Sequence, residues 1–268
     1  RELGVPVLPP DVNESQPWFS VSPDGVRFGL NAIKNVGVSA VQSVLQVRQD
    51  KGRIESVFTL CEDVDLRLVN KRVIESLAKS GALDSVGPPT DLWAQLAAAS
   101  KRARFLAVVD RAIEHGQRAQ KDREKGQSQL FDAMFGGDSV EAAPVSELPD
   151  APPLTEVQQL AFEKEALGLF MSGHPIRRFA GDLKAIGARH STELTTSMAD
   201  MTMGGLVSGH RPLKTKAGDR MCAFNIEDDA GSFEVVVFPE AFKHHGHLVE
   251  NDALLVVPTP AGVPFTQA

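Results

Sequence analysis

The spacing of apolar residues divides the chain into helical and extended parts. From Phe28 to about Gly87, apolar positions recur every three or four residues in short pieces, which predicts several short helices joined by tight turns. Residues 1–27 are rich in Pro, Asp, Ser and Gly and predict an extended loop with a short strand at Phe19–Val21. From Met203 onward the period changes to two, which predicts strands.

A longer helical pattern covers about residues 91–125. One set of apolar side chains falls at steps of three, four or seven and is expected to share the buried face: Leu92, Leu96, Ala99, Ala103, Leu106 and Ile113. Basic side chains occupy the other positions and are expected to form a solvated face: Lys101, Arg102, Arg104, Arg111 and Arg118.

A linker and a further helix follow. Residues 136–153 are small, acidic and punctuated by Pro, as linkers are. Thr155 and Gln158 have the spacing of a capping box, in which each side chain bonds an amide at the helix start. We expect this helix to end at Gly173–Pro175. Its expected buried positions are Val157, Leu160, Ala161, Leu167, Phe170 and Met171.

Alternation in the last part of the chain predicts a small antiparallel module. Two runs place apolar residues at every second position: Cys222, Phe224 and Ile226 in the first, and Phe233, Val235 and Val237 in the second. Asp228–Gly231 between them has the composition of a hairpin turn. The sequence therefore predicts an α+β protein of several domains, with helices first and a small β-barrel last.

Composition and charge are those of an ordinary folded protein. Of the 268 residues 42% are hydrophobic and 24% charged, and the formal net charge is −7. Residues 91–130 carry eight basic and five acidic groups, a net of +3, whereas residues 131–165 carry one and eight, a net of −7. Because Cys61 and Cys222 are far apart in sequence, they indicate neither a disulfide framework nor a metal knuckle, and a cytoplasmic location is expected. The opening Arg1, without a leader or an 18-residue apolar run, predicts a piece of a longer protein that enters no membrane.

The first candidate site is a turn between two short helices. Lys34, Asn35, Val36 and Gly37 separate apolar helical stretches, and we expect positive φ at Asn35 and Gly37. This is the pattern of a helix-hairpin-helix motif, which binds DNA phosphates through backbone amides and a helix N-terminus. An ordinary helical hairpin with a glycine cap is the alternative. A second hairpin-like stretch, residues 68–83, contains Lys71 and Arg72 and favours the DNA interpretation.

Two further candidates follow along the chain. Gln127, Leu130 and Phe131 have the form of a sliding-clamp-binding peptide, although a helix end folded back into the core would look the same. In the β-module, basic residues accompany Phe224, Phe233 and Phe238, as in single-strand-binding barrels. The alternative is that these aromatic residues form the core, which we expect for Phe224 and Phe233 because they alternate with polar neighbours. The basic residues are Arg211, Lys214, Lys216 and Arg220.

Three histidines and two aspartates are expected to be ordinary surface features. His244, His245 and His247 have no Cys or acidic partner at metal-ligand spacing and are assigned to a solvated helix end. Asp228 and Asp229 are assigned to turn chemistry.

Taken in order, five stretches resemble the bacterial DNA polymerase III alpha subunit. They run through nearly the whole chain, to about Val257, and are Val7–Ser15, Arg27–Gly37, Val69–Asp84, Glu163–Pro175 and Glu234–Pro239. The resemblance implies a helix-hairpin-helix pair, a helical connector and an OB-fold. The corresponding domains are residues 1–27 (end of the fingers), 28–90 (helix-hairpin-helix), 91–135 (basic helix and clamp peptide), 136–153 (linker), 154–200 (connector) and 201–268 (OB-fold).

The resemblance also implies a function. The family transfers nucleotides as a DNA-directed DNA polymerase, using two Mg²⁺ ions held by palm aspartates that lie upstream of Arg1. We therefore expect no catalytic residue, metal or cofactor in this chain, and no activity from it alone. The implied partners are duplex DNA at Lys34–Gly37, single-stranded DNA at the OB-fold, the sliding clamp at Gln127–Phe131, and other subunits of the holoenzyme.

The tail departs from the family pattern. Pro258–Pro264 replaces the turn expected between the fourth and fifth strands, so we expect an OB-fold without its fifth strand. Two alternatives stay open: a stand-alone DNA-binding or clamp-adaptor protein, and the error-prone paralogue of the alpha subunit.

Overall fold

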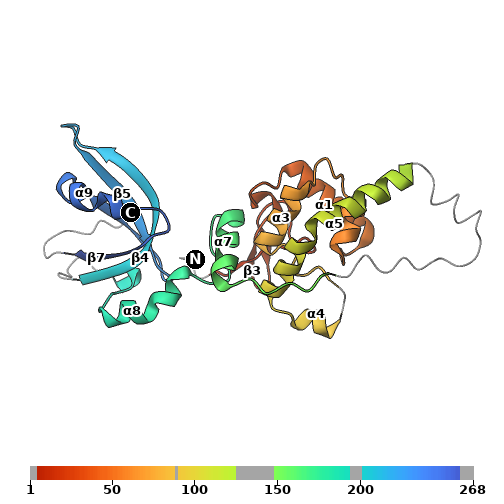
Figure 1. The fold of residues 1–268 in the computed structure, drawn as a ribbon, viewed down its shortest axis with the longest axis horizontal. Helices are drawn as coiled ribbons and strands as arrows, with labels where there is room; N and C mark the ends of the chain where they lie inside the picture. The colour runs from red at the N-terminus through yellow and green to blue at the C-terminus, as the bar shows by residue number, and fades with distance from the viewer. Residues whose placement is uncertain (1–4, 88–89, 125–147, 194–200, 260–268) are drawn as a thin grey trace, which may run out of the picture. The chain divides into compact units, whose positions relative to one another are not determined.

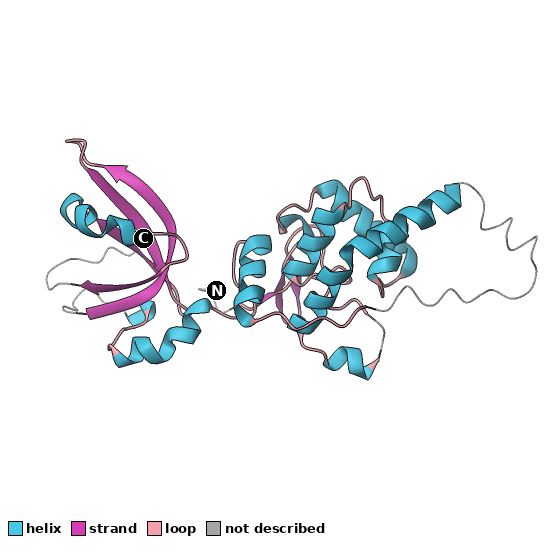
Figure 2. Ribbon diagram, in the orientation of Figure 1, coloured by secondary structure: helices cyan, strands magenta, loops and turns pink. Residues whose placement is uncertain are grey.

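The computed structural model describes residues 5–87, 90–124, 148–193 and 201–259. The chain divides into two compact units, of which the first ends at Met171 and the second begins at Ser172 (Figure 1). The first unit is mainly helical and the second contains a curled antiparallel sheet (Figure 2). The predicted α+β class is confirmed.

The first unit opens with a small sheet. Strands β1 (Val7–Leu8), β2 (Ser20–Ser22) and β3 (Gly25–Arg27) lie in the order β1-β3-β2, with β1 parallel and β2 antiparallel to β3. The predicted strand at Phe19–Val21 corresponds to β2, one residue further on. The short 3-10 helix η1 (Leu30–Ala32) follows directly.

Three short helices follow, as predicted. They are α1 (Val38–Lys51), α2 (Val57–Asp63) and α3 (Lys71–Ser80), and both α2 and α3 pack against α5 (Ala98–Glu124) (Figure 1). These elements share one apolar core whose largest enclosed side chains include Leu30, Ile33, Leu60, Ile74, Leu77, Leu83 and Phe105.

The prediction of one long helix from residue 91 is wrong. The structure has α4 (Asp91–Gln95) and α5 (Ala98–Glu124), and an extended Leu96, with ψ 133°, separates them. Leu92 is 78% exposed, because Trp93 takes the inward position and stacks edge-to-face on Phe105. The buried face of α5 is formed by Arg102, Ala103, Phe105, Val108, Val109 and Ala112.

The prediction that Arg102 lies on the solvated face is also wrong. It is buried and bonds Asp84 and Glu163, so its charge is neutralised inside the unit. Helix packing thus buries a basic residue at a position that the apolar period alone predicts to be exposed.

The helix α7 (Glu156–Leu167) begins with the predicted capping box at Thr155 and Gln158. It ends at Gly168, which has the left-handed φ of 78°, rather than at Gly173–Pro175. Val157 and Ala161 are exposed, contrary to expectation, because the inward face is rotated toward Arg102 and includes a paired carboxylate. That face is formed by Leu160, Glu163, Ala166 and Leu167.

The second unit starts with helical turns and continues as a sheet. Its elements are η2 (Pro175–Phe179), α8 (Ala180–Ala185), η3 (Ser191–Glu193), β4 (Met201–Lys214), β5 (Arg220–Glu227), β6 (Ser232–Val237), α9 (Pro239–His245), η4 (Gly246–Leu248) and β7 (Leu254–Thr259). The antiparallel order is β6-β5-β4-β7. Figure 2 shows the sheet curling into a half-barrel, which is consistent with the predicted incomplete OB-fold.

The predicted hairpin of this unit is confirmed, whereas the predicted alternation holds in β6 but not fully in β5, where Ala223 between Cys222 and Phe224 is also buried. Cys222, Phe224 and Ile226 are buried, and the hairpin joins β5 to β6 at Glu227 opposite Ser232. No helix within the described ranges is long and apolar enough to cross a lipid bilayer.

Candidate nucleic-acid interface

The turn between η1 and α1 alternates buried and exposed residues. Ile33 and Val36 are buried in the core, whereas Lys34, Asn35 and Gly37 are exposed. Asn35 has the left-handed φ of 66°, and the Val36 N–H donates to the Ile33 carbonyl at 3.2 Å. The apolar pair therefore anchors the turn while its polar residues face solvent.

Gly37 does not have the positive φ expected for it. Its φ of −76° and ψ of 159° are extended, and an added Cβ would meet no atom within 4 Å. Gly37 is the N-cap of α1, a position that takes extended backbone in any helix. The turn needs left-handed backbone only at Asn35.

The start of α1 is open to an external anion. Gly37 has no side chain that could accept from the amides of the first turn, and that turn contains no acidic residue. The first amides of a helix have no intrahelical partner and carry a partial positive charge. By contrast, the side chain of Ser56 caps α2 and that of Asn70 caps α3. Among these three helices, only the α1 N-terminus lacks a side-chain cap.

Helices α3 and α7 hold the turn in place. The Lys34 N–H donates to the Ala166 carbonyl of α7 at 2.8 Å, and the Asn35 side-chain amide donates to Ser76 Oγ of α3 at 3.3 Å. Lys79 and Glu165 link the same two helices through an ion pair of 2.8 Å. The orientation of the α1 amides is thus fixed before any ligand arrives.

The second hairpin-like stretch places its cations differently. Lys71 and Arg72 begin α3 and are exposed, but Lys71 Nζ lies 2.7 Å from an Asp110 oxygen and 3.9 Å from Glu75. The hydrogen bond to Asp110 raises the pKa of Lys71. The Asn70 side chain already accepts from the Arg72 and Val73 amides. This stretch therefore offers surface charge rather than an open helix start.

In the β-module the four predicted cations do not share one face. Lys214 and Arg220 are direct partners across the β4–β5 ladder and share one face, whereas Arg211 lies opposite Ala223. Successive side chains of a strand alternate between its faces, so Arg211, three positions before Lys214, points to the opposite face. Arg211 pairs with Glu234 there. Lys216 lies in the exposed turn that joins the two strands.

The aromatic residues of the module differ in their burial. Phe224 is buried and Phe233 packs partly against the core, whereas Phe238 is 64% exposed. Arg220 lies over the ring of Phe242, with its Cζ 5.7 Å from the centroid. Because Lys214 pairs with Arg220 at the end of the β4–β5 ladder and Lys216 lies in the turn between them, these three cations gather at the hairpin tip.

The predicted clamp-binding residues Gln127, Leu130 and Phe131 lie outside the described residues.

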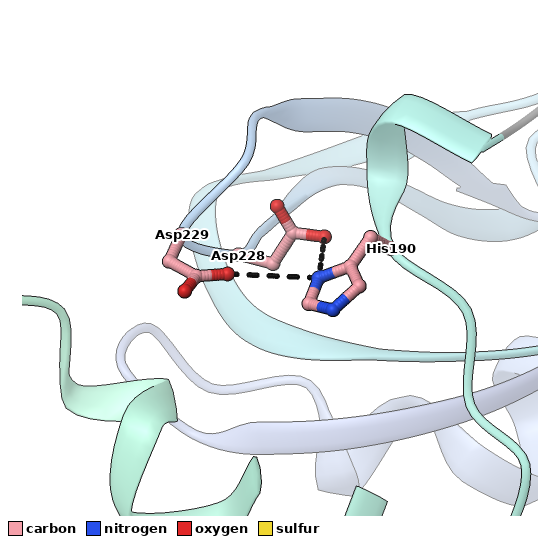
Figure 3. A group of neighbouring side chains, drawn as sticks. All are labelled: His190, Asp228 and Asp229. Carbon is pink, nitrogen blue, oxygen red and sulfur yellow. Dashed lines mark ion pairs between the residues drawn. The ribbon is translucent and has the colours of Figure 1, made fainter. Parts of the chain in front are cut away.

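A group that sequence patterns did not indicate lies beside a cavity of about 590 Å³ in the second unit. His190 Nδ1 lies 3.6 Å from Asp229 Oδ1 and 3.9 Å from Asp228 Oδ2 (Figure 3). Thirty-eight residues separate His190 from Asp228, so no local spacing could have revealed the group. His244 and His245 are exposed at the end of α9 and His247 is exposed in η4, so their assignment to a solvated helix end is confirmed.

Asp228 has the turn role expected from its sequence. Its carboxylate accepts hydrogen bonds from Ala230 N at 2.8 Å and Gly231 N at 2.7 Å, and from the amide and hydroxyl of Ser191 at 2.6 and 2.7 Å. Burial alone would raise the pKa of Asp228, but these hydrogen bonds outweigh burial and hold it below its usual value. The carboxylate is thus already well satisfied within the protein.

Comparisons with known proteins agree with this geometry. A family model described as a helix-hairpin-helix motif matches residues 4–91, which contain the turn and α1 to α3. The chain is also 34% identical over 261 residues to the DNA polymerase III subunit alpha of Pseudomonas aeruginosa, covering 96% of this chain and 22% of that protein. It is 35% identical to that of Thermus aquaticus, covering 96% and 20%, and 34% identical to that of Bacillus subtilis, covering 94% and 21%.

The resemblance inferred from the sequence is confirmed. The chain carries a helix-hairpin-helix region, and along nearly its whole length it corresponds to a C-terminal part of the DNA polymerase III alpha subunits. It spans about a fifth of the length of the curated relatives it matches.

Proposed function

We propose that this chain is the part of a DNA polymerase III alpha subunit that grips DNA without regard to sequence and docks the sliding clamp. The single observation that carries the DNA part is the open N-terminus of α1 behind the turn at Lys34–Gly37. Nucleotidyl transfer and its Mg²⁺ are assigned to the parts of the longer relatives that this chain does not span.

At the proposed site a DNA phosphate accepts hydrogen bonds from the amides at the start of α1. The partial positive charge of the helix end and the exposed Lys34 ammonium stabilise the anion. These groups contact no base edge, so binding is independent of sequence. Lys71 and Arg72 add positive charge at the surface of the same unit.

The other proposed contacts are distributed along the chain. Lys214, Lys216 and Arg220 at the hairpin tip of the β-module attract the backbone of single-stranded DNA. Gln127, Leu130 and Phe131 bind the sliding clamp, and further subunits of the holoenzyme complete the assembly. The proposed location is the cytoplasm.

A charge placed at the N-cap tests the DNA site. Gly37→Asp supplies a carboxylate that satisfies the α1 amides itself and repels phosphate, and the extended backbone of Gly37 accepts the new side chain without contact. We expect an unchanged or slightly higher melting temperature, since Asp is a better N-cap than Gly. We expect duplex affinity to fall about tenfold or more, measured by fluorescence anisotropy of a labelled duplex across a salt series.

Two controls make this test specific. Gly37→Asn also satisfies the amides but adds no charge, and it should weaken binding less. Gly181→Asp adds the same charge at an open position of α8, in the other unit, and should leave binding within about twofold. Equal affinity of the wild type and Gly37→Asp would refute the proposed site.

A further inference from the structure

The two tryptophans of the chain lie in opposite environments. Trp93 is 8% exposed, and its indole N–H donates to the Val86 carbonyl at 3.0 Å. Trp18 is 69% exposed, in the loop that leads into β2. Its neighbours Phe19 and Val21 are 52% and 92% exposed, so this edge of the small sheet presents apolar side chains to solvent. A large aromatic side chain left this exposed is typical of a binding surface.

The Trp18 loop is fixed to the segment that leads into the phosphate-binding turn. The Leu30 N–H donates to the Gln16 carbonyl at 3.1 Å, and the Asn31 N–H donates to the Pro17 carbonyl at 2.9 Å. These two hydrogen bonds attach the loop to η1, which the turn at Lys34–Gly37 follows directly.

A close backbone crossing adds to this attachment. A Cβ at Gly29 would lie 2.4 Å from the carbonyl carbon of Trp18, so the two backbones cross where only glycine fits. Phe19 next to it packs edge-to-face on the buried Phe28, with ring centroids 4.7 Å apart. The exposed indole therefore stands on a rigid base, and fixing it on a ligand has a low entropic cost.

We propose that Trp18 is a stacking platform for an unpaired nucleobase of the same DNA whose phosphate binds at the start of α1. The proposal rests on the proposed function and adds the kind of DNA that this site prefers. Every base has a planar π-face, so an exposed indole binds single strands with little sequence preference. In a continuous duplex the neighbouring bases cover those faces. The platform therefore favours DNA with a single-stranded end next to the gripped phosphates.

Intrinsic fluorescence tests this directly, because stacking on a base quenches an indole. The full chain is titrated with a blunt duplex and with the same duplex carrying a short thymidine overhang. We expect the overhang DNA to quench tryptophan emission and the blunt duplex to leave it nearly unchanged. Trp18→Ala, which retains the enclosed Trp93, should show no quenching by either DNA.

Affinity provides the second readout. By anisotropy, Trp18→Ala should weaken binding of the overhang DNA about fivefold or more and leave blunt-duplex binding within about twofold. Trp18→Phe should restore most of the loss, because a phenyl ring also stacks. Val21→Ser removes an exposed apolar group of the same edge that cannot stack, and it should bind like the wild type.

The two proposals fail in different ways. If neither DNA binds in a salt-dependent manner, the proposed function is wrong, and the platform with it. If both DNAs bind with salt dependence but equally well, without quenching and without an effect of Trp18→Ala, only the platform is refuted, and the exposed edge is then a protein-contact surface. A loss in Val21→Ser equal to that in Trp18→Ala would likewise overturn stacking in favour of general apolar contact.

Discussion

Arg102 of α5 and Glu163 of α7 form a buried ion pair, with Nη1 2.9 Å from Oε1 and side chains that are 5% and 0% exposed. Arg102 also donates to Asp84 through Nε and Nη2, and the second Glu163 oxygen accepts from the Met171 N–H at 2.8 Å. Burial alone would lower the pKa of Arg102, but its two carboxylate partners raise it. The network fastens α7, which supports the turn at Lys34–Gly37, to the helical core.

Removing one member of this pair should destabilise the first unit strongly. Glu163→Ala removes the acceptor of Arg102 Nη1 and of the Met171 N–H, while Asp84 still balances the guanidinium charge, and we expect a loss of about 1–3 kcal/mol in the free energy of unfolding. Glu165→Ala is the matched control, since Glu165 lies on the same helix and pairs at the surface with Lys79. That change should cost about 0–1 kcal/mol. Urea denaturation followed by circular dichroism measures both, and equal losses would contradict the prediction.

The same substitution at two positions of the turn should have opposite effects. Asn35→Ser places serine at a φ of 66° and removes the hydrogen bond to Ser76, so it should destabilise by about 1–2 kcal/mol. Gly37→Ser places a good N-cap residue on extended backbone and should be neutral or slightly stabilising. Asn35→Gly serves as the control that relieves strain at this φ. Thermal denaturation distinguishes them, and a larger loss at position 37 would disprove this account of the turn.

Acid should weaken the β5–β6 hairpin through Asp228. The pKa of Asp228 is lower in the folded protein than its ordinary value of 3.8, so the ionised carboxylate stabilises the fold above about pH 4. This contribution is lost as the pH falls through the folded pKa. Melting temperatures measured from pH 6 to pH 3 should fall less steeply in Asp228→Asn than in the wild type. A wild-type slope in Asp228→Asn would contradict this assignment.

Gln127, Leu130 and Phe131 remain a predicted clamp peptide. If Leu130 and Phe131 anchored the core, replacing each by alanine would cost about 2–5 kcal/mol of stability. As partner anchors they should instead be interface hot spots. We expect Leu130→Ala with Phe131→Ala to keep the melting temperature and to lose binding to a bacterial sliding clamp in a calorimetric titration. Leu92→Ala, at an exposed leucine of α4, should keep both, and clamp binding that survives the double change would exclude the peptide.

The chain alone should not extend a primer. The proposed function assigns it the grip on DNA and not the chemistry of transfer. Incubation with a primed template, Mg²⁺ and all four nucleotides should give no product above a buffer control. Incorporation by the purified chain would show that it contains catalytic residues of its own.

Local sequence determined the features that depend only on interactions between residues close together in the chain. The capping box of Thr155 and Gln158, the hairpin at Asp228–Gly231 and the left-handed Asn35 each follow from side chains and backbone within a few residues. The order of family motifs along the chain likewise needed no coordinates, and it was enough to indicate the polymerase III alpha resemblance. Phe224 was placed in the core by its alternation alone.

Tertiary structure decided whatever depends on partners far along the chain. Arg102 is buried because Glu163, sixty-one residues away, pairs with its charge. The helical period of a sequence contains no information about such a distant partner. Trp93 takes the buried position instead of Leu92, because its ring packs edge-to-face on Phe105 and its indole N–H donates to the Val86 carbonyl. Strand register places Arg211 on the opposite face from Lys214 and Arg220, although all three are close in sequence. Periodicity predicts which residues share a face, but the free energy of long-range packing and ion pairing decides which face is buried.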